Sequence, residues 1–358
     1  MTRADDRDFL ARAAAATGIR APGPAVGEEF VHSLLSLHYG LHGSLRRIPT
    51  EKDETFHLGT GRDEFLIKIS PPDEDRAAVN LQSEAMAFVA RSAPQLRVQR
   101  LVTGVADQVE TVIEIPGCPQ RRVLRVMEYL PGDPLSSQSP TAGQLRSVGA
   151  ALGTLDIALR DFRHGAEDRL LMWDLKLFHR MRALADYVGD EANRSLGADL
   201  FARFDREIVP RLAALETQAI HGDFSPFNVL VDPRASHYVV GVLDFGDTLR
   251  SPVIFEVSVG MANQLGADAE APWAQAMDFL TGYRSVRPIE ASELPLLATA
   301  VPARLLLRAL ITEWRAARHP ERRDYLHSHS QGDWQRLRRA LSVPADEVRA
   351  ALCALRVP

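Results

Sequence analysis

Two short segments of the sequence carry the side chains that phosphoryl transfer requires. The tripeptide HGD ends at Asp223, and Asn228 follows it after four intervening residues. Further along, the apolar run VVGVL, typical of a strand, leads directly into Asp244. Phosphoryl transfer needs a carboxylate that orients the acceptor hydroxyl and takes its proton, and oxygen ligands that hold Mg2+ against the phosphates. We therefore interpret Asp223 as the general base, and Asn228 and Asp244 as the metal ligands.

Each of the tripeptides HGD and DFG could by itself be a simple turn, in which aspartate caps the backbone and glycine supplies a positive φ. Their order and separation favour instead a catalytic loop, residues 219–232, and a metal-binding segment, residues 244–247. Because Asp223 already fills the place of the base, we expect His221 to order the catalytic loop through a backbone hydrogen bond.

A kinase site also needs a cation that holds the phosphates, and only three of the 42 basic residues are lysines. Lys68 lies between apolar residues in the strand-like run EFLIKIS, and the helix predicted after it supplies Glu84 as an ion-pair partner. The alternative for Lys68 is a strand lysine whose ammonium reaches solvent. Glu74, in the same segment, is the alternative to Glu84.

The elements that would position these residues change character along the chain. Residues 39–115 favour short strands that alternate apolar and polar positions, with one helix after a Pro-Pro pair, and a further strand ends at the turn PGDP. Beyond residue 139, apolar residues recur at helical spacing in three stretches, namely 141–162, 170–188 and 198–215. The pattern predicts an α+β protein with a small β-rich N-terminal lobe, residues 1–131, and a larger helical C-terminal lobe, residues 132–358.

Composition limits the classes of partner. The 358 residues carry a formal net charge of -5, and 46% of them are hydrophobic, which is typical of a globular protein and excludes a disordered or fibrous chain. No basic surplus exists for a broad nucleic-acid or anionic-membrane surface, so neither partner is expected. Two cysteines without metal or redox spacing, and an N-terminus without an apolar signal run, favour a reduced, cytoplasmic protein.

The two motifs resemble a known family. HGDFSPFNVLVD followed by GVLDFGD is similar to the aminoglycoside phosphotransferase and choline kinase superfamily, which resembles protein kinases in fold. Further segments look like the hydroxylysine kinase group, so that the resemblance extends from about residue 30 to residue 340: PTEKDETFHL, VLDFGDTLRSPVIFEVSVGMA, GYRSVRPIEASELPLLATAVPARLLLRAL and HPERRDYL.

The resemblance implies a protein-kinase-like two-lobed fold that binds ATP or GTP with Mg2+ in the cleft. It further implies transfer of the γ-phosphoryl group to a hydroxyl of a small amine or amino acid. The family's catalytic aspartate falls on Asp223, its metal ligands on Asn228 and Asp244, and its phosphate lysine on Lys68. An aminoglycoside phosphotransferase and a choline or homoserine kinase remain alternatives within the class. A pseudokinase that binds nucleotide without turnover is the alternative from another class.

The chain departs from the protein-kinase pattern in having no GxGxxG motif over the phosphates. Residues 48–57 are expected to cover them instead, with Lys52, Thr55 or backbone N–H groups as donors, although Lys52 could equally be a solvated loop charge. Lys176 is expected on a helix surface. The backbone of the hinge is expected to meet the nucleobase, and comprises Met127, Glu128, Tyr129 and Leu130.

Recognition of an amino acid requires partners for an ammonium and a carboxylate group. Asp247 and Glu256 are candidates for the ammonium, and Arg250 and Arg304 for the carboxylate. Arg304 lies in an apolar segment where an unpaired charge would be costly, so a structural ion pair with Glu256 is the alternative. The tryptophans of the helical region are expected in the helix core, namely Trp173, Trp273 and Trp314.

Overall fold

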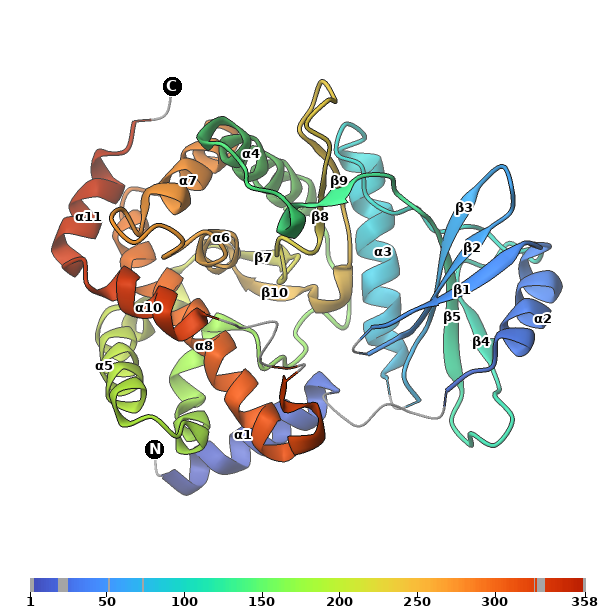
Figure 1. The fold of residues 1–358 in the computed structure, drawn as a ribbon, viewed down its shortest axis with the longest axis horizontal. Helices are drawn as coiled ribbons and strands as arrows, with labels where there is room; N and C mark the ends of the chain where they lie inside the picture. Colours follow the sequence, from blue (N-terminus) through green and yellow to red (C-terminus); the bar gives the residue numbers. More distant parts are fainter. Residues whose placement is uncertain are drawn as a thin grey trace.

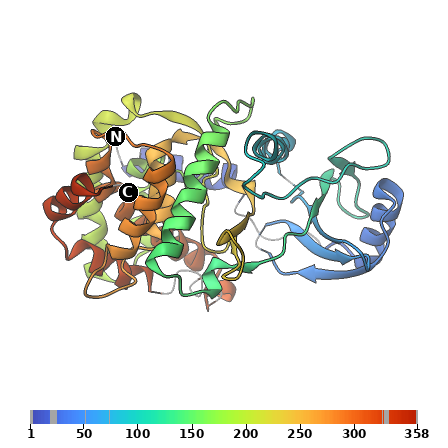
Figure 2. The ribbon, with the colours of Figure 1, turned by 90° about the horizontal axis from the view of Figure 1, so that it is seen from above.

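The computed structural model describes residues 3–18, 25–50, 52–72, 74–324, 326 and 332–356. It has two lobes of unequal size, with a β-sheet in the smaller lobe and mainly helices in the larger one (Figure 1). Seen from above, helix α3, Arg76–Ser92, lies between the lobes (Figure 2). The expected α+β, two-lobed architecture is therefore confirmed.

The small lobe is built on a five-stranded antiparallel sheet in the order β1-β2-β3-β5-β4. Period-two alternation sorts its side chains between two faces, as in any strand. One face buries residues such as Phe56, Ile67 and Leu124 against helix α2, Glu28–Tyr39. The other face, which carries Lys68, is turned toward α3 and the large lobe. The strands are β1 Ser44–Ile48, β2 Glu54–Gly59, β3 Glu64–Ile69, β4 Thr111–Ile113 and β5 Arg122–Glu128.

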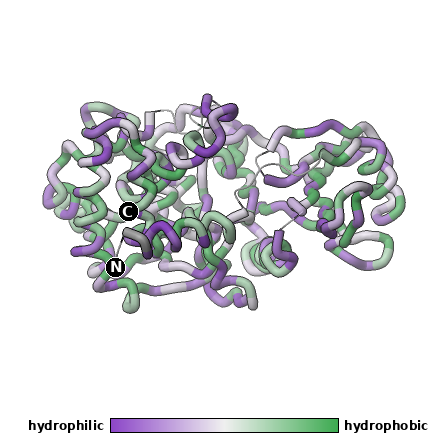
Figure 3. The backbone as a smooth tube through the Cα atoms, turned by 90° about the horizontal axis from the view of Figure 1, so that it is seen from below, coloured by the Kyte–Doolittle hydropathy of each residue, from purple (hydrophilic) through white to green (hydrophobic). Residues whose placement is uncertain are grey.

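The large lobe packs its helices around one apolar core (Figure 3). Helices α4 and α7 approach so closely that a Cβ at Gly149 or Gly282 would collide with the backbone of the opposite helix, which explains both glycines. The helices are α4 Ala142–Leu159, α5 Glu191–Glu207, α6 Val253–Ala262, α7 Ala274–Val286, α8 Leu297–Arg318, α10 Asp333–Leu341 and α11 Ala345–Ala354.

One helical stretch, Leu294–Arg318, is long and apolar enough to cross a membrane, but 89% of its apolar window is buried inside the protein. Burial of this kind is what a central core helix shows. The candidate carboxylate ligand Arg304 lies on this helix.

The segments 219–232 and 244–247 lie among short strands beside the helices. β7, Thr217–Ile220, pairs with β10, Leu249–Pro252, and β8, Val229–Val231, pairs with both β6, Asp133–Pro134, and β9, Val239–Val242. The catalytic loop thus connects β7 to β8, and the metal-binding segment connects β9 to β10. The strand ends that border these two segments lie together: Ile220 pairs with Leu249, and the Leu243 N–H donates to the Asn228 carbonyl oxygen at 2.8 Å.

Two expectations about the elements are wrong. Helix α1, Arg3–Thr17, packs on the large lobe (Figure 1), where Phe9 and Leu10 are buried in the core. The sequence pattern instead placed residues 1–131 in the small lobe. An amphipathic helix needs an apolar partner, but its own pattern does not say which lobe provides it. Residues 170–188 form two short 3-10 segments, η2 Leu175–Arg180 and η3 Arg182–Tyr187, and no long helix.

Candidate active site

The catalytic loop is ordered by its own histidine and by a buried acid. The ring of His221 is fully buried; Nε2 lies 2.9 Å from the carbonyl oxygen of Leu243, and Nδ1 accepts a hydrogen bond from the Asp223 N–H at 3.3 Å. Burial lowers the pKa of His221, so the ring is neutral at physiological pH. Gly222 has a φ of 82°, and its N–H donates to Oε2 of Glu256 at 2.9 Å. The backbone hydrogen bond expected of His221 is thus present.

Asp223 points into the cleft from this loop. The amide of Asn228 donates to Oδ2 of Asp223 at 2.8 Å and to its carbonyl oxygen at 3.0 Å, which fixes the carboxylate in one orientation. Oδ1 lies 3.9 Å from Nη2 of Arg304, and 36% of the Asp223 side chain is exposed. The surrounding protein raises the pKa of Asp223 by burial, while Arg304 opposes this shift and Asp244 adds to it.

Asp244 adopts a left-handed backbone conformation, with a φ of 57°, which is uncommon for a residue other than glycine. Its Oδ1 accepts a hydrogen bond from the Gly246 N–H at 3.1 Å, and its Oδ2 lies 3.2 Å from Nζ of Lys68. This ammonium lowers the pKa of Asp244 to about 2. A hydrogen bond of 2.8 Å from the Leu243 N–H to the Asn228 carbonyl oxygen brings Asn228 beside Asp244.

The oxygens of Asn228 and Asp244 fit a magnesium ion. The described residues contain no group of three or more His, Cys, Asp or Glu side chains that could enclose a metal by themselves. Mg2+ is commonly held by one or two protein ligands together with substrate phosphates and water, which is the arrangement that this pair allows. Asn228 uses its amide nitrogen on Asp223, which leaves its side-chain oxygen for the ion.

Lys68 reaches across the cleft from strand β3. Its Nζ lies 3.2 Å from Oδ2 of Asp244 and 3.5 Å from Oδ2 of Asp53, and the side chain is 12% exposed. Burial favours the neutral amine, but Asp244 and Asp53 outweigh it and raise the pKa of Lys68. The ammonium is therefore charged and lies where a phosphate clamp is needed.

The structure does not pair Lys68 with Glu84, which corrects that expectation. Helix α3 turns Leu81, Ala85 and Val89 toward the core, so Glu84 lies on its outer side. The Glu84 side chain is 56% exposed, and its recorded ion-pair contact is with His164 at 4.0 Å. The phase of a helix is set by its apolar face, and this face leaves Glu84 directed away from the cleft.

The loop expected to cover the phosphates contacts Glu74, which in turn forms an ion pair with the large lobe. Nζ of Lys52 lies 2.8 Å from Oε2 of Glu74, and Glu74 also lies 3.7 Å from Nη2 of Arg169 in the large lobe. Arg169 donates to the carbonyl oxygen of Gly246 at 3.0 Å. Lys52 is thus paired with protein in this conformation. Thr55 is buried directly opposite Lys68 on the neighbouring strand.

The expected hinge spans the end of strand β5, which includes Met127 and Glu128; Met127 and Leu130 are buried, and Glu128 and Tyr129 are exposed. The Glu128 N–H donates to the Arg100 carbonyl oxygen at 2.8 Å, and the Tyr129 N–H to the Glu64 carbonyl oxygen at 3.0 Å. These two donors are occupied, so contact of the hinge backbone with a nucleobase stays a prediction.

Two of the four candidate acceptor ligands are not in the cleft. Nε of Arg250 lies 2.8 Å from Oε1 of Glu167, and this ion pair occupies the guanidinium on strand β10. Glu256 is fully buried behind the catalytic loop, where it accepts the Gly222 hydrogen bond, so it cannot reach an acceptor. The alternative considered for Arg304, a structural ion pair with Glu256, is not among the ion pairs of the described residues, and Arg304 contacts Asp223 instead.

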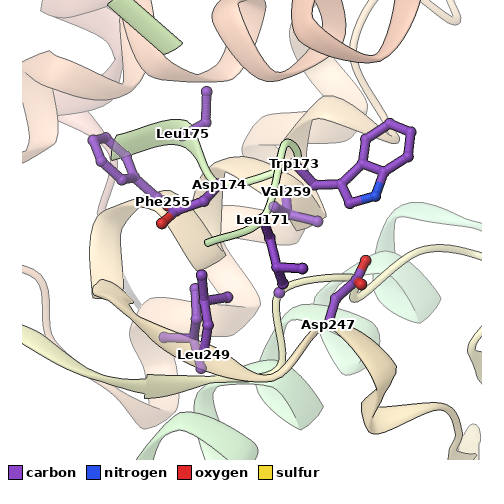
Figure 4. Close-up of a pocket in the computed structure, with 10 residues that line it drawn as sticks. Leu171, Trp173, Asp174, Leu175, Asp247, Leu249, Phe255 and Val259 are labelled. Carbon is purple, nitrogen blue, oxygen red and sulfur yellow. The ribbon is translucent and has the colours of Figure 1, made fainter. Parts of the chain in front are cut away.

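The other two candidates, Arg304 and Asp247, lie near Asp223. Arg304 donates to the carbonyl oxygen of Trp173 at 2.7 Å, with its guanidinium 6.0 Å from the indole ring. Burial and the neighbouring Asp223 raise the pKa of Asp247 to about 6. Trp173 and Asp247 line a pocket together with apolar residues such as Leu171 and Leu249 (Figure 4).

Sequence reasoning missed three residues of this region. Trp173 was expected in a helix core, but it lies in a loop at the pocket, where no periodic pattern marks it. Arg169 has no motif of its own. Asp53 lies in the segment PTEKDETFHL, and the resemblance of this segment to the hydroxylysine kinase group gives the Asp53 carboxylate no role. Lys176, expected on a helix surface, lies in η2 and contacts Asp174 at 3.2 Å.

Fold and site together define an enzyme that transfers a phosphoryl group to an alcohol, with a kinase-like arrangement of lobes. A model of the phosphotransferase enzyme family, APH, matches residues 44–289, and the chain belongs to this family. Hydroxylysine kinase from Mus musculus is 24% identical over 338 residues, covering 88% of this chain and 89% of the relative. Homoserine kinase from Rhodopseudomonas palustris is 28% identical over 265 residues, covering 73% of this chain and 76% of that one.

Solved structures show the same fold. A microcompartment-associated aminopropanol kinase superposes with a TM-score of 0.67 at 15% identity, over 93% of this chain and all of that chain. An amicoumacin kinase solved in complex with AMP-PNP, Ca2+ and Ami has a TM-score of 0.64 at 13% identity, over 87% of this chain and 94% of that one. At this identity the likeness establishes a kinase-like fold.

Proposed function

We propose that the chain is a Mg2+-dependent kinase that transfers the γ-phosphoryl group of ATP or GTP to a hydroxyl of a small amine or amino acid resembling hydroxylysine. The observation that carries the proposal is one constellation at the floor of the cleft. Asn228 fixes Asp223 at 2.8 Å, and Lys68 of the other lobe lies 3.2 Å from Asp244. The activity of the hydroxylysine kinase relatives and the AMP-PNP and Ca2+ of the amicoumacin kinase support the same assignment.

In this mechanism Asp223 accepts a hydrogen bond from the acceptor hydroxyl and takes its proton as the phosphoryl group moves. Lys68 holds the phosphates, and Asn228 and Asp244 hold the metal. Mg2+, when bound, neutralises charge on the phosphates. The protein thus contributes mainly positioning and fixed charge, which suffices for phosphoryl transfer.

An amino acid is favoured over an amino alcohol or an aminoglycoside because a cation lies beside the base. The guanidinium of Arg304 is 3.9 Å from Asp223 and suits a carboxylate group, while Asp247 suits an ammonium group. A choline-type or aminoglycoside acceptor has no carboxylate to pair with Arg304. We further propose that the protein acts in the cytoplasm and engages neither nucleic acid nor membrane.

The test is a nucleoside-diphosphate release assay with ATP and with GTP against hydroxy amino acids, amino alcohols and aminoglycosides. We expect turnover with a hydroxy amino acid and at least tenfold lower kcat/KM for the matching amino alcohol. Preference for an aminoglycoside would overturn the acceptor class. Mg2+-dependent nucleotide binding without product from any acceptor would indicate a pseudokinase.

A further inference from the structure

Strands β2, β3 and β5 place two cations side by side in the cleft. In the sheet register Thr55 lies opposite Lys68, and Lys68 lies opposite Arg125, so the three side chains form one row on the face turned toward the large lobe. Like charges directly opposite each other on neighbouring strands are unfavourable. Such a row requires an anion between the two cations.

Asp53 provides this anion. Its Oδ2 lies 3.5 Å from Nζ of Lys68 and 4.0 Å from Nη2 of Arg125, so a single oxygen faces both cations. Arg125 is 2% exposed and Asp53 is 16% exposed, so both charges are largely shielded from bulk water. Thr50 donates to the carbonyl oxygen of Asp53 and lies 3.1 Å from the Thr55 hydroxyl, which closes the loop around Asp53.

Lys68 cannot keep both of its carboxylate partners once a nucleotide binds. On the proposed function, Asp244 would hold the metal in place of Lys68, and no acid of helix α3 lies near Lys68 to replace it. Glu84 lies on the outer side of that helix, and Glu74 is paired with Lys52. Asp53 is then the remaining carboxylate that can hold the Lys68 side chain against the phosphates.

We propose that Asp53, which Arg125 holds in place, is the residue that positions the Lys68 side chain. The sequence predicts this role for Glu84 of helix α3. Arg125 also retains a buried Nε without a hydrogen-bond partner, and a buried donor of this kind calls for an explanation. A phosphate oxygen held by Lys68 would lie on the same side of the sheet. The inference rests on the proposed kinase function, but its geometry concerns Lys68 alone.

The first test does not depend on turnover. Reductive methylation with 13C-formaldehyde keeps the charge of lysine and labels only Lys52, Lys68 and Lys176 besides the N-terminus, so few signals appear in a carbon-proton NMR spectrum. Lys68→Arg identifies the Lys68 signal by its disappearance. Asp53→Asn should shift this signal and leave the other two lysine signals in place, whereas Glu84→Gln should shift none. An unmoved Lys68 signal in Asp53→Asn would overturn the proposal.

The second test separates positioning from a structural effect. In a folded Asp53→Asn variant we expect kcat to fall at least tenfold, with the KM for the acceptor within about twofold of the parent. Asp53→Glu should recover part of the loss, and Glu84→Gln should keep full activity. Equal losses in Asp53→Asn and Glu84→Gln, or a gain in Asp53→Asn because a blocking carboxylate was removed, would each contradict the inference. If no acceptor supports turnover, the proposed function fails while the NMR experiment still decides the role of Asp53.

Discussion

At the scale of single residues, the neighbours of Asp223 determine the orientation of its carboxylate and how far it is exposed. Asn228 fixes one carboxylate oxygen at 2.8 Å, and Arg304 approaches the other at 3.9 Å. The side chain remains partly open to the cleft, so an acceptor hydroxyl can reach it. A carboxylate that is both fixed and accessible is what a general base requires.

Replacing Asp223 with Ala should lower kcat by about 100- to 10,000-fold, the range typical for the loss of a general base. The nucleotide contacts involve other side chains, so the Kd for the Mg2+-nucleotide complex should change little. Steady-state kinetics and calorimetric titration with a non-hydrolysable analogue measure the two quantities. Turnover at the parental rate would exclude Asp223 as the base.

At the scale of elements, helices α4, α6 and α7 carry buried ionisable side chains beneath the catalytic loop, on the side of the protein interior. Asp156 on α4 is fully buried; its Oδ2 accepts a hydrogen bond from the Tyr283 hydroxyl at 2.7 Å, and its Oδ1 has no hydrogen-bond partner. Burial raises the pKa of Asp156 to about 7, although Arg287 opposes this shift. Burial and the nearby Asp156 likewise raise the pKa of Glu256, which holds the Gly222 N–H.

The raised pKa of Asp156 predicts how stability depends on pH. Between about pH 4 and pH 7 the folded protein keeps a proton on Asp156 that the unfolded chain has lost, so stability falls as the pH rises through this window. Asp156→Asn cannot ionise and should lose less stability over the same window. We expect the Tm of the variant to gain on the parent by a few degrees between pH 5 and pH 8, measured by calorimetry.

A matched control is Asp161→Asn, since Asp161 is exposed just beyond the end of the same helix. Its Tm should follow the parent across the whole pH range. Parallel curves for the parent and Asp156→Asn would show that Asp156 is ionised in the folded protein throughout.

At the scale of the whole molecule, charges connect the two lobes across the cleft. Lys68 of the small lobe contacts Asp244 of the large lobe at 3.2 Å, and Glu74 contacts Arg169 at 3.7 Å. Helix α1 packs on the large lobe before the chain continues into the small one, so the polypeptide passes between the lobes twice (Figure 1). On the proposed function, the nucleotide would contact both lobes.

Mg2+ and nucleotide together should therefore raise the Tm, because only the folded protein has the site. At a nucleotide concentration 100 times the Kd, the added stability is about 2.7 kcal/mol. Thermal denaturation with ATP or GTP, with and without EDTA, measures the effect. Asp244→Asn should lose the part that depends on Mg2+, and an EDTA-insensitive shift in the parent would argue against a metal-bridged nucleotide.

The sequence by itself determined that HGD and DFG lie between short strands and that Lys68 lies in a strand, while their catalytic roles stay a prediction. These features are local: HGD directly follows the short strand β7, DFG lies one residue after β9, and period-two alternation assigns Lys68 to a strand between buried neighbours. Such short-range preferences act before the chain is folded, so a single sequence reveals them.

Only the tertiary structure decided which distant residues meet. The phase of α3 removes Glu84 from the cleft, Arg250 is occupied by Glu167, and Glu256 lies beneath the loop it supports. Asp53, which directly precedes β2, lies next to Lys68 of β3 because these two strands are paired in one register. These contacts follow from burying apolar faces and pairing charges between segments far apart in the chain, and the local pattern of a helix or loop does not specify its partner.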